Sequence, residues 1–188
     1  MLGQNLKRGI VIQMDARLAG YTASAENIAS KNDDMMQQVT GRIGLLGGEE
    51  FLYIPYEPNQ ITYVETELDC ISSRFTGCVM AAFMWGGKRC VAHVATPECN
   101  EKWNDLKEKI TLLSEFNPSR LFNKKNNILR VKAANETKFS GDTPTSQSDC
   151  FGIIDSKNKK YGGFLVSTRM GAHTGLSQHT VSSCVPIT

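Results

Sequence analysis

The pattern of apolar and polar positions along the chain favours short strands over helices. Strands are expected where apolar residues alternate with polar ones or form short runs between turn residues. The segments that fit are Lys7–Asp15, Glu49–Pro58, Ile61–Asp69, Cys78–Trp85, Arg89–Thr96, Ile128–Ala134, Cys150–Asp155 and Tyr161–Thr168. Three other stretches lack a strand pattern. These are residues 16–41, which are polar with a weak helical pattern, residues 138–149, which are typical of a surface loop, and the tail after residue 168, which shows no clear element.

Two pairs of these strands are predicted to form hairpins. Gly86-Gly87 separates Cys78–Trp85 from Arg89–Thr96, and two-residue hairpin turns need the positive φ that glycine adopts freely. The segment SKNKK, residues 156–160, connects the last two predicted strands in the same way. The Gly-Gly hairpin is the clearest element of the sequence.

A single firm helix is predicted after the first hairpin, from about Thr96 to about Phe116. Thr96 offers a hydroxyl cap, Pro97 suits the first helical position, and Glu98 places a negative charge in the first turn. Apolar residues follow at spacings of three and four, namely Trp103, Leu106, Ile110 and Leu113. Asn117-Pro118 then ends the helix. Many short strands with one helix indicate an α+β fold with a two-layer β core.

Length and composition narrow the class of protein. The 188 residues, of which 40% are hydrophobic, fit one domain spanning residues 1–188 with a sizeable core. The net charge is only +2, which weighs against nucleic-acid binding through a basic surface. The sequence shows no classical signal peptide and no apolar stretch of membrane-spanning length, so no membrane association is expected. The six cysteines form no closely spaced pairs, and most are expected to be reduced thiols.

The first hairpin raises a question about Cys78 and His93. With Gly86-Gly87 as the turn, antiparallel pairing places Met80 opposite His93. Cys78 lies two residues from Met80, so it shares a face with His93 as a diagonal neighbour, within reach of longer side chains. A turn with an odd number of residues would place the two on opposite faces.

A cysteine and a histidine in this arrangement can form a nucleophilic pair. A neighbouring imidazolium stabilises the thiolate, and the histidine can later give its proton to a leaving amine. Gly77 would let a substrate approach the backbone closely, and the N–H of Cys78 would be a natural oxyanion donor. Two buried or surface residues with no catalytic role remain a competing interpretation, because such pairs on neighbouring strands are common.

Other side chains of the sequence could take part in such a site. A metal site built from Cys90, His93 and Cys99 is disfavoured, because residues three apart on a strand point to opposite faces. His173 and His179 could replace His93 as the base, although both lie in the polar tail and are better read as solvated. Asp69 and Asp149 are candidates to orient the imidazole only because they are carboxylates.

The segment around Cys78 resembles the catalytic segment of the bacterial glutamine deamidase toxins. These comprise the cytotoxic necrotizing factor catalytic domain and the Burkholderia lethal factor, with the chemoreceptor glutamine deamidases as more distant relatives. The resemblance rests on FTGC, residues 75–78, the following strand, the Gly-Gly turn and His93 on the returning strand. Upstream, FLYIPYEPNQ resembles a strand followed by a proline and an aromatic residue in the lethal-factor type. Ser72 stands six positions before Cys78, where some members carry a threonine, and the match covers Phe51 to Pro97.

The resemblance implies a fold, a reaction and a setting. The fold would be a β-sandwich of mixed sheets with peripheral helices. The reaction would convert a protein glutamine to glutamate through a thioester, with Cys78, His93 and Ser72 as catalytic residues and neither cofactor nor metal. The protein would be a monomeric toxin or virulence effector, secreted by a bacterium without a classical signal peptide and cytoplasmic in the producing cell. It would act in the host cytosol on a host protein such as a small GTPase or a translation factor.

Two rival functions also fit these residues. A cysteine protease or acyltransferase would use the same Cys78–His93 pair, since the sequence does not separate a side-chain amide from a backbone amide. A non-catalytic effector or binding module would use both residues only for packing. The substitution Cys78→Ser distinguishes a binding module from an enzyme, because a binding module would keep its effect and an enzyme would lose it.

Overall fold

The computed structural model describes residues 11–12, 28–33, 36–46, 49–122, 146–170 and 176–187. Side chains are described for residues 36–44, 49–120, 150–163 and 186–187. The strand predicted at Ile128–Ala134 and the candidate His173 lie outside the described residues, and so do residues 7–10 and 13–15 of the first predicted strand.

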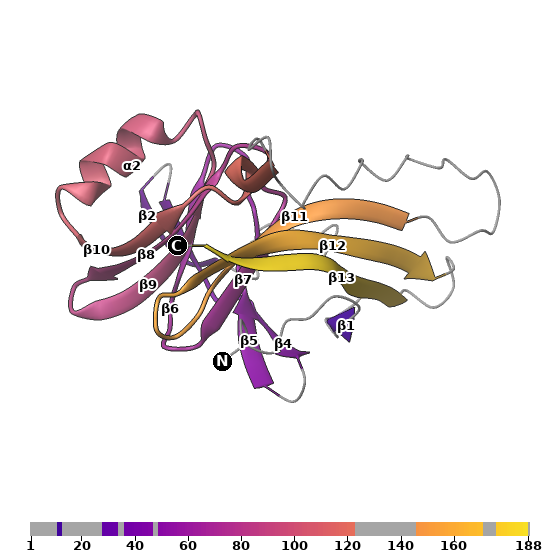
Figure 1. Cartoon of the computed structure of the whole chain (residues 1–188). Coiled ribbons are helices and arrows are strands. Elements are labelled where there is room, and N and C mark those ends of the chain that lie inside the picture. The colour runs from indigo at the N-terminus through magenta and orange to yellow at the C-terminus, as the bar shows by residue number, and fades with distance from the viewer. Residues whose placement is uncertain are drawn as a thin grey trace.

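The described strands form two mixed sheets (Figure 1). In spatial order, the seven-stranded sheet contains β1 (Val11–Ile12), β13 (Leu176–Ile187), β12 (Lys160–Met170), β11 (Ser146–Ile154), β7 (Asp69–Ser73), β5 (Glu49–Tyr53) and β4 (Arg42–Leu46). The six-stranded sheet contains β10 (Thr111–Phe116), β8 (Val79–Trp85), β9 (Lys88–Val94), β6 (Ile61–Glu65), β3 (Met36–Val39) and β2 (Ile28–Asp33). The pairs β5–β7 and β3–β6 are parallel, and the other pairs are antiparallel.

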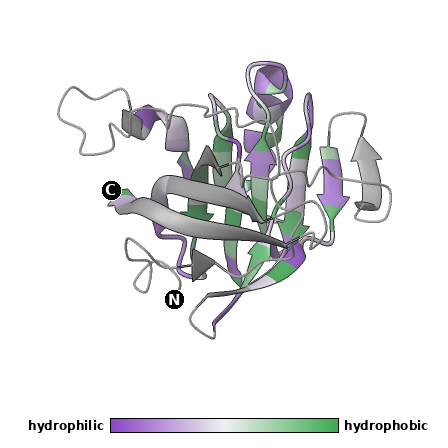
Figure 2. Cartoon of the chain, turned by 90° about the vertical axis from the view of Figure 1, so that its right-hand side faces the viewer, coloured by the Kyte–Doolittle hydropathy of each residue, from purple (hydrophilic) through white to green (hydrophobic). Residues whose placement is uncertain are grey.

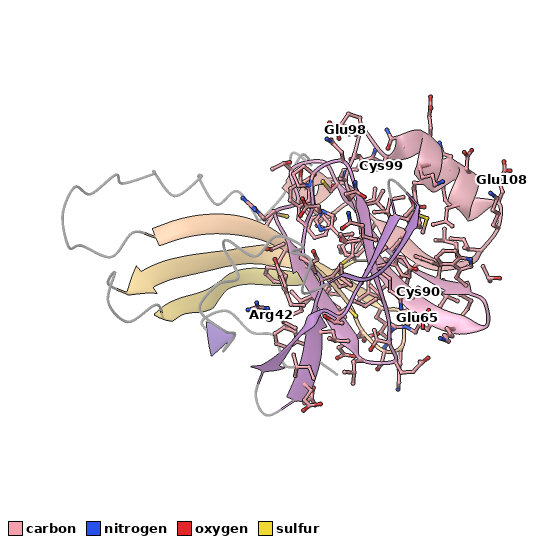
Figure 3. The ribbon with its side chains drawn as sticks, turned by 180° about the vertical axis from the view of Figure 1, so that it is seen from behind. Arg42, Glu65, Cys90, Glu98, Cys99 and Glu108 are labelled. Carbon is pink, nitrogen blue, oxygen red and sulfur yellow. The ribbon has the colours of Figure 1, made fainter. Side chains whose placement is uncertain are left out.

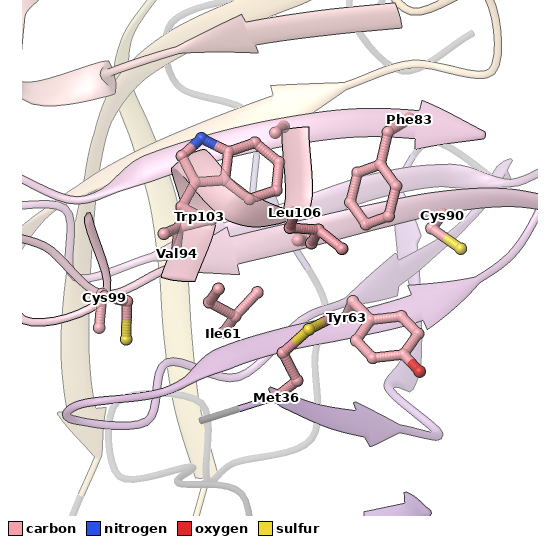
Figure 4. Packing of buried hydrophobic residues seen from close by; sticks show 12 residues of the cluster. Met36, Ile61, Tyr63, Phe83, Cys90, Val94, Cys99, Trp103 and Leu106 are labelled. Atoms are coloured by element: carbon pink, nitrogen blue, oxygen red, sulfur yellow. The ribbon is translucent and has the colours of Figure 1, made fainter. Parts of the chain in front are cut away.

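The hydrophobic core lies in two layers. One cluster fills the space between the sheets and combines residues of both, including Cys70 of β7 and Ile154 of β11 with Met80 of β8 and Val91 of β9. A second cluster lies on the opposite face of the six-stranded sheet, where helix α2 (Asn100–Lys107) packs Trp103 onto the strands (Figure 4). Hydrophobic positions run along the central strands in Figure 2. This is an α+β fold built as a sandwich of mixed sheets, as predicted.

The Gly-Gly hairpin forms in the predicted register. Gly86 and Gly87 adopt φ values of 57° and 79°, the left-handed region that such a two-residue turn requires. Met80 pairs with His93, and Trp85 pairs with Lys88 at the turn. The second predicted hairpin, β11–β12 across residues 155–159, is also present.

The prediction for the helix was wrong in its bounds. Helix α2 ends at Lys107, and residues 111–116 form strand β10 at the edge of the six-stranded sheet. Cys99 occupies the N-cap position without a side-chain cap, and Pro97 precedes the helix. Leu112 and Leu113 are exposed rather than packed on the helical face. The free edge of β8 explains the difference, since it offers backbone groups that residues 111–116 pair with, and local spacing carries no trace of that edge.

Three segments predicted without strands contain them. Residues 16–41 were assigned a weak helical pattern, yet β2 and β3 lie there. The tail forms β13, the longest strand described, and residues 146–149 begin β11 instead of ending a loop. These strands carry few apolar residues in alternation, so their position depends on neighbouring strands rather than on a local pattern. Pro118–Phe122 adds a short 3₁₀ helix.

Candidate functional site

Cys78 and His93 lie on the same face of the β8–β9 hairpin. Val79 pairs with Val94 and Met80 with His93, so Cys78, directly before β8, is the diagonal neighbour of His93. The face is the one between the two sheets, because Cys78, Met80 and Val91 belong to the inter-sheet cluster. The structure therefore confirms the prediction that Cys78 and His93 share a face of the hairpin.

His93 is enclosed by aromatic rings. The imidazole stacks on Phe75 with ring centroids 4.2 Å apart and planes at 5°. Tyr56 approaches it from another direction, with centroids 5.1 Å apart. The side chain is fully buried, and this burial lowers the pKa of His93 to about 3, because a charged imidazolium is poorly stabilised away from water. The histidine is therefore neutral at physiological pH.

Ser72 determines which nitrogen of His93 carries the proton. Ser72 Oγ lies 2.7 Å from His93 Nδ1 and 2.7 Å from the carbonyl oxygen of Ile54. A hydroxyl has one proton, and the carbonyl can only accept it. Ser72 thus donates to Ile54 and accepts from His93, so the proton of the neutral ring lies on Nδ1.

The remaining ring nitrogen is left with a free lone pair. Among the described residues, His93 Nε2 is a fully buried atom without a hydrogen-bond partner. Buried polar atoms normally have a partner, so each exception in a folded protein needs an explanation. An imidazole held through Nδ1 with Nε2 available is the form that acts as a general base.

Cys78 is a buried thiol on the same face of the hairpin as His93. Its side chain is 3% exposed, and desolvation raises its pKa. Backbone hydrogen bonds from Thr96, Thr76 and Cys78 itself oppose that shift, because N–H groups directed at the sulfur favour the thiolate. In the free protein both members of the pair are therefore neutral, and the thiolate–imidazolium ion pair expected from the sequence is disfavoured by burial.

The surroundings of Cys78 open toward solvent on one side. Thr76 is exposed and Gly77 is half-buried. A Cβ added at Gly77 would meet only Thr96 Oγ1, at 3.9 Å, an ordinary contact distance. The space beside Gly77 is thus not filled by the described residues, as the proposed approach of a substrate requires.

Tyr56 and Arg74 lie at the outer side of the site. Burial raises the pKa of Tyr56, and the charged form of the nearby Cys78 raises it further. The Arg74 guanidinium lies 5.9 Å from the centre of the Tyr56 ring, and this arginine is exposed. Tyr56 therefore links the buried His93 ring to an exposed arginine.

The structure places the alternative bases and orienting residues only in part. His173 lies outside the described residues. His179 of β13 pairs with Ser167 of β12, and its side chain is not described. Asp69 Oδ1 accepts a hydrogen bond from the N–H of Ser156 at the β11–β12 turn. Asp149 is placed on β11 through its backbone alone.

The candidate metal ligands point away from each other. Cys90 belongs to the cluster under α2, on the opposite face of β9 from His93. In Figure 3, Cys99 lies beside Glu98 and Cys90 lies beside Glu65 at the other end of the sheet. Within the described part of the chain, no group of three histidine, cysteine or acidic side chains is arranged to hold a metal ion.

Sequence reasoning placed Cys78, His93, Ser72 and Gly77 but missed their surroundings. It assigned no role to Phe75 or Tyr56, although both belong to the segments that carried the resemblance. It also read Thr96 as a helix cap, whereas the Thr96 hydroxyl donates to the carbonyl oxygen of Gly77. An aromatic residue three positions before a candidate nucleophile was the only available signal.

Comparison with known proteins adds no relative to this description. No protein-family model matches the chain, and neither a curated protein nor a solved structure matches it. Among the described residues, no helix is both long and apolar enough to cross a membrane. The resemblance to glutamine deamidase toxins therefore stays an expectation drawn from the segment around Cys78.

Proposed function

We propose that the protein is a cysteine-dependent protein-glutamine deamidase. The observation that carries this proposal is the state of His93: it is buried, held through Nδ1 by Ser72, and left with Nε2 unpartnered among the described residues. Cys78 lies on the same face one diagonal step away. A packing histidine gains nothing from an unpaired buried nitrogen, whereas a general base requires one.

The reaction follows from the neutral state of the pair. Nε2 of His93 takes the thiol proton as Cys78 Sγ forms a bond to the carboxamide carbon of glutamine. The resulting oxyanion is stabilised by the N–H of Cys78. The C–N bond then breaks, the proton passes from His93 to the nitrogen, and ammonia leaves a thioester on Cys78. Water adds to the thioester and gives a proton to His93. The C–S bond then breaks as His93 returns that proton to the sulfur, which releases glutamate and restores the thiol.

Burial suits this order of events. A thiol with a raised pKa beside a histidine with a lowered pKa exchanges its proton only when the sulfur attacks, since isolated charges are costly there. The imidazolium that forms is transient and is stabilised through Nδ1–H by Ser72, whose hydroxyl is itself held by Ile54.

The proposed substrate is a host protein. We propose that a bacterium secretes the chain without a classical signal peptide and that it acts as a monomer in the host cytosol. A small GTPase or a translation initiation factor is the first target to test, following the resemblance. One deamidation adds a negative charge and removes a pair of hydrogen-bond donors, so it alters the target permanently.

Intact-mass spectrometry of purified candidate targets tests the proposal. Each target is incubated with the wild type, Cys78→Ser or His93→Gln. Conversion of one glutamine to glutamate replaces NH₂ by OH, and the expected result is that mass gain with the wild type alone. Fragmentation of the product then locates the glutamine.

Three outcomes would overturn the proposal in different ways. Backbone cleavage of the target, dependent on Cys78, would indicate a protease with the same pair. Attachment of an amine or acyl group would indicate a transferase. An effect on host cells that survives Cys78→Ser unchanged would indicate a binding module in which the pair only packs.

A further inference from the structure

The carbonyl group of Gly77, next to the proposed nucleophile, is held by two side chains. Thr96 Oγ1 donates to the Gly77 oxygen at 2.8 Å, and Asn117 Nδ2 donates to the same oxygen at 2.5 Å. One carbonyl oxygen has two lone pairs, so these two donors occupy both. A residue that merely ends a loop does not need two side-chain donors.

The two donors come from the strands on either side of β8. In the six-stranded sheet β8 lies between β10 and β9, and it is antiparallel to both. The carboxyl ends of β9 and β10 therefore lie beside the start of β8, where Cys78 stands. Thr96 follows β9 and Asn117 follows β10 directly. The pairing of the sheet thus brings both side chains to the same peptide.

The orientation of the Asn117 amide is determined by a neighbour. Asn117 Oδ1 accepts hydrogen bonds from the N–H of Ser119 at 2.9 Å and from Ser119 Oγ at 2.6 Å. The N–H of Ser119 can only donate, so the oxygen of the amide must face Ser119 and the NH₂ group must face Gly77. The donor to the Gly77 oxygen is therefore assigned without ambiguity.

Holding this carbonyl also directs the N–H of Cys78. A trans peptide is planar, so the C=O of Gly77 and the N–H of Cys78 point in opposite directions. Two hydrogen bonds to the oxygen restrict rotation of the peptide plane, and they polarise the N–H on its other side. An oxyanion donor must be in place before charge develops, and such preorganisation is the source of its effect.

We propose that Thr96 and Asn117 are positioning residues that orient the Cys78 N–H toward the oxyanion of the reacting carbonyl. This inference rests on the proposed function, because it assumes that Cys78 attacks a carbonyl carbon. Neither side chain touches the reacting atoms. Each acts through the Gly77–Cys78 peptide, and both sequence motifs had been assigned to helix ends instead.

Comparison of two reactions of the same thiol tests the inference without knowledge of the natural target. Acylation of Cys78 by p-nitrophenyl acetate passes through a tetrahedral oxyanion, whereas alkylation by iodoacetamide does not. The variants are Thr96→Val and Asn117→Asp, which keep side-chain size and remove the donor. We expect acylation to fall about tenfold or more in each variant, with alkylation within about twofold of the wild type.

Matched controls separate positioning from stability. Thr66→Val and Asn158→Asp make the same chemical changes at the other end of the hairpin, where Thr66 accepts from the N–H of Leu68 and Asn158 accepts from Arg89. Both controls should keep the wild-type ratio of acylation to alkylation. Thr96→Ser keeps the hydroxyl that Thr96→Val removes, so its acylation rate should stay near that of the wild type.

The possible failures are distinguishable. If wild-type protein is acylated through Cys78 and Thr96→Val and Asn117→Asp keep the wild-type ratio, the positioning role is wrong and the proposed function stands. If both reactions fall in parallel, the two residues act only on folding or access, which also overturns the inference. If the wild type is acylated no faster than Cys78→Ser, the proposed function fails, and the positioning role fails with it.

Discussion

Ser72 Oγ and His93 Nδ1 lie 2.7 Å apart, and this hydrogen bond joins the two sheets of the sandwich. Ser72 belongs to β7 of the seven-stranded sheet, and His93 belongs to β9 of the six-stranded sheet. The orientation of the imidazole therefore depends on how the sheets pack. The same bond places the proton on Nδ1, and Nε2 has no hydrogen-bond partner among the described residues.

Ser72→Ala is expected to lower activity more than it lowers stability. The substitution removes the hydrogen bonds of Ser72 Oγ to His93 Nδ1 and to the Ile54 carbonyl oxygen. A buried polar group left without a hydrogen bond costs about 1–3 kcal/mol of stability. Loss of the oriented base should reduce deamidation or acylation roughly 10²-fold. Urea unfolding gives the first quantity and acylation kinetics give the second.

Ser73→Ala is the matched control for this prediction. Ser73 is the next residue of β7, is also buried, and shares a 2.8 Å hydrogen bond with Tyr53 Oη away from His93. It should lose comparable stability and keep its activity. Equal losses of activity in the two variants would show that Ser72 serves only the packing of β7.

Stability should fall in acid because His93 is buried as a neutral ring. Its pKa is about 3 in the folded protein and near 6.5 when exposed, so between these values the unfolded chain binds the extra proton. The contribution of His93 to stability is fully present above its pKa in the unfolded chain. It is lost as the pH falls toward its pKa in the folded protein. The slope due to His93 is about 1.4 kcal/mol per pH unit.

His93→Gln isolates this contribution from those of other titrating groups. The free energy of unfolding is measured by urea for wild type and variant at about pH 4.5 and about pH 7.5. We expect the wild type to lose more stability than the variant between the two conditions. An equal loss in both proteins would mean that His93 titrates normally and is not held neutral.

Gly77→Ala should separate folding from function. The added Cβ has only one neighbour, at 3.9 Å, and φ of Gly77 lies outside the left-handed region. Replacing glycine where alanine fits stabilises a protein by about 0.4–1 kcal/mol. We expect an unchanged or raised melting temperature together with reduced deamidation, because the methyl group occupies the space a substrate needs. Full activity in the variant would place the substrate elsewhere.

Gly152→Ala should lower stability, in contrast to Gly77→Ala. Gly152 of β11 pairs with Ser72 of β7. A Cβ at Gly152 would lie 2.7 Å from Pro118 Cγ and 3.1 Å from Met80 Sδ. Overpacking of this kind costs about 1–3 kcal/mol. The measurement is the melting temperature of Gly152→Ala beside that of Gly77→Ala. The same substitution is then made where the space for a Cβ is filled and where it is open. A melting temperature of Gly152→Ala equal to that of the wild type would contradict the prediction.

Local chemistry made the β8–β9 hairpin predictable. Gly86-Gly87 encodes the turn, and the turn determines the register that puts Cys78 on the face of His93. Ser72 could be proposed as a partner only through the resemblance, since nothing local relates β7 to β9. Its hydrogen bond to His93 depends on the second sheet closing over the first.

The errors share one cause. Residues 111–116 continue a helical spacing, yet they form β10, because the edge of β8 offers hydrogen bonds that no local pattern reports. Thr96 and Asn117 resemble helix ends in the sequence, but both donate to the Gly77 carbonyl. The sequence by itself determined the strands with clear turns, the α+β class and the Cys78–His93 face. The tertiary structure alone decided the edge strand, the burial that keeps His93 neutral and the contacts of Ser72, Thr96 and Asn117, because each depends on segments that meet only when the sheets assemble.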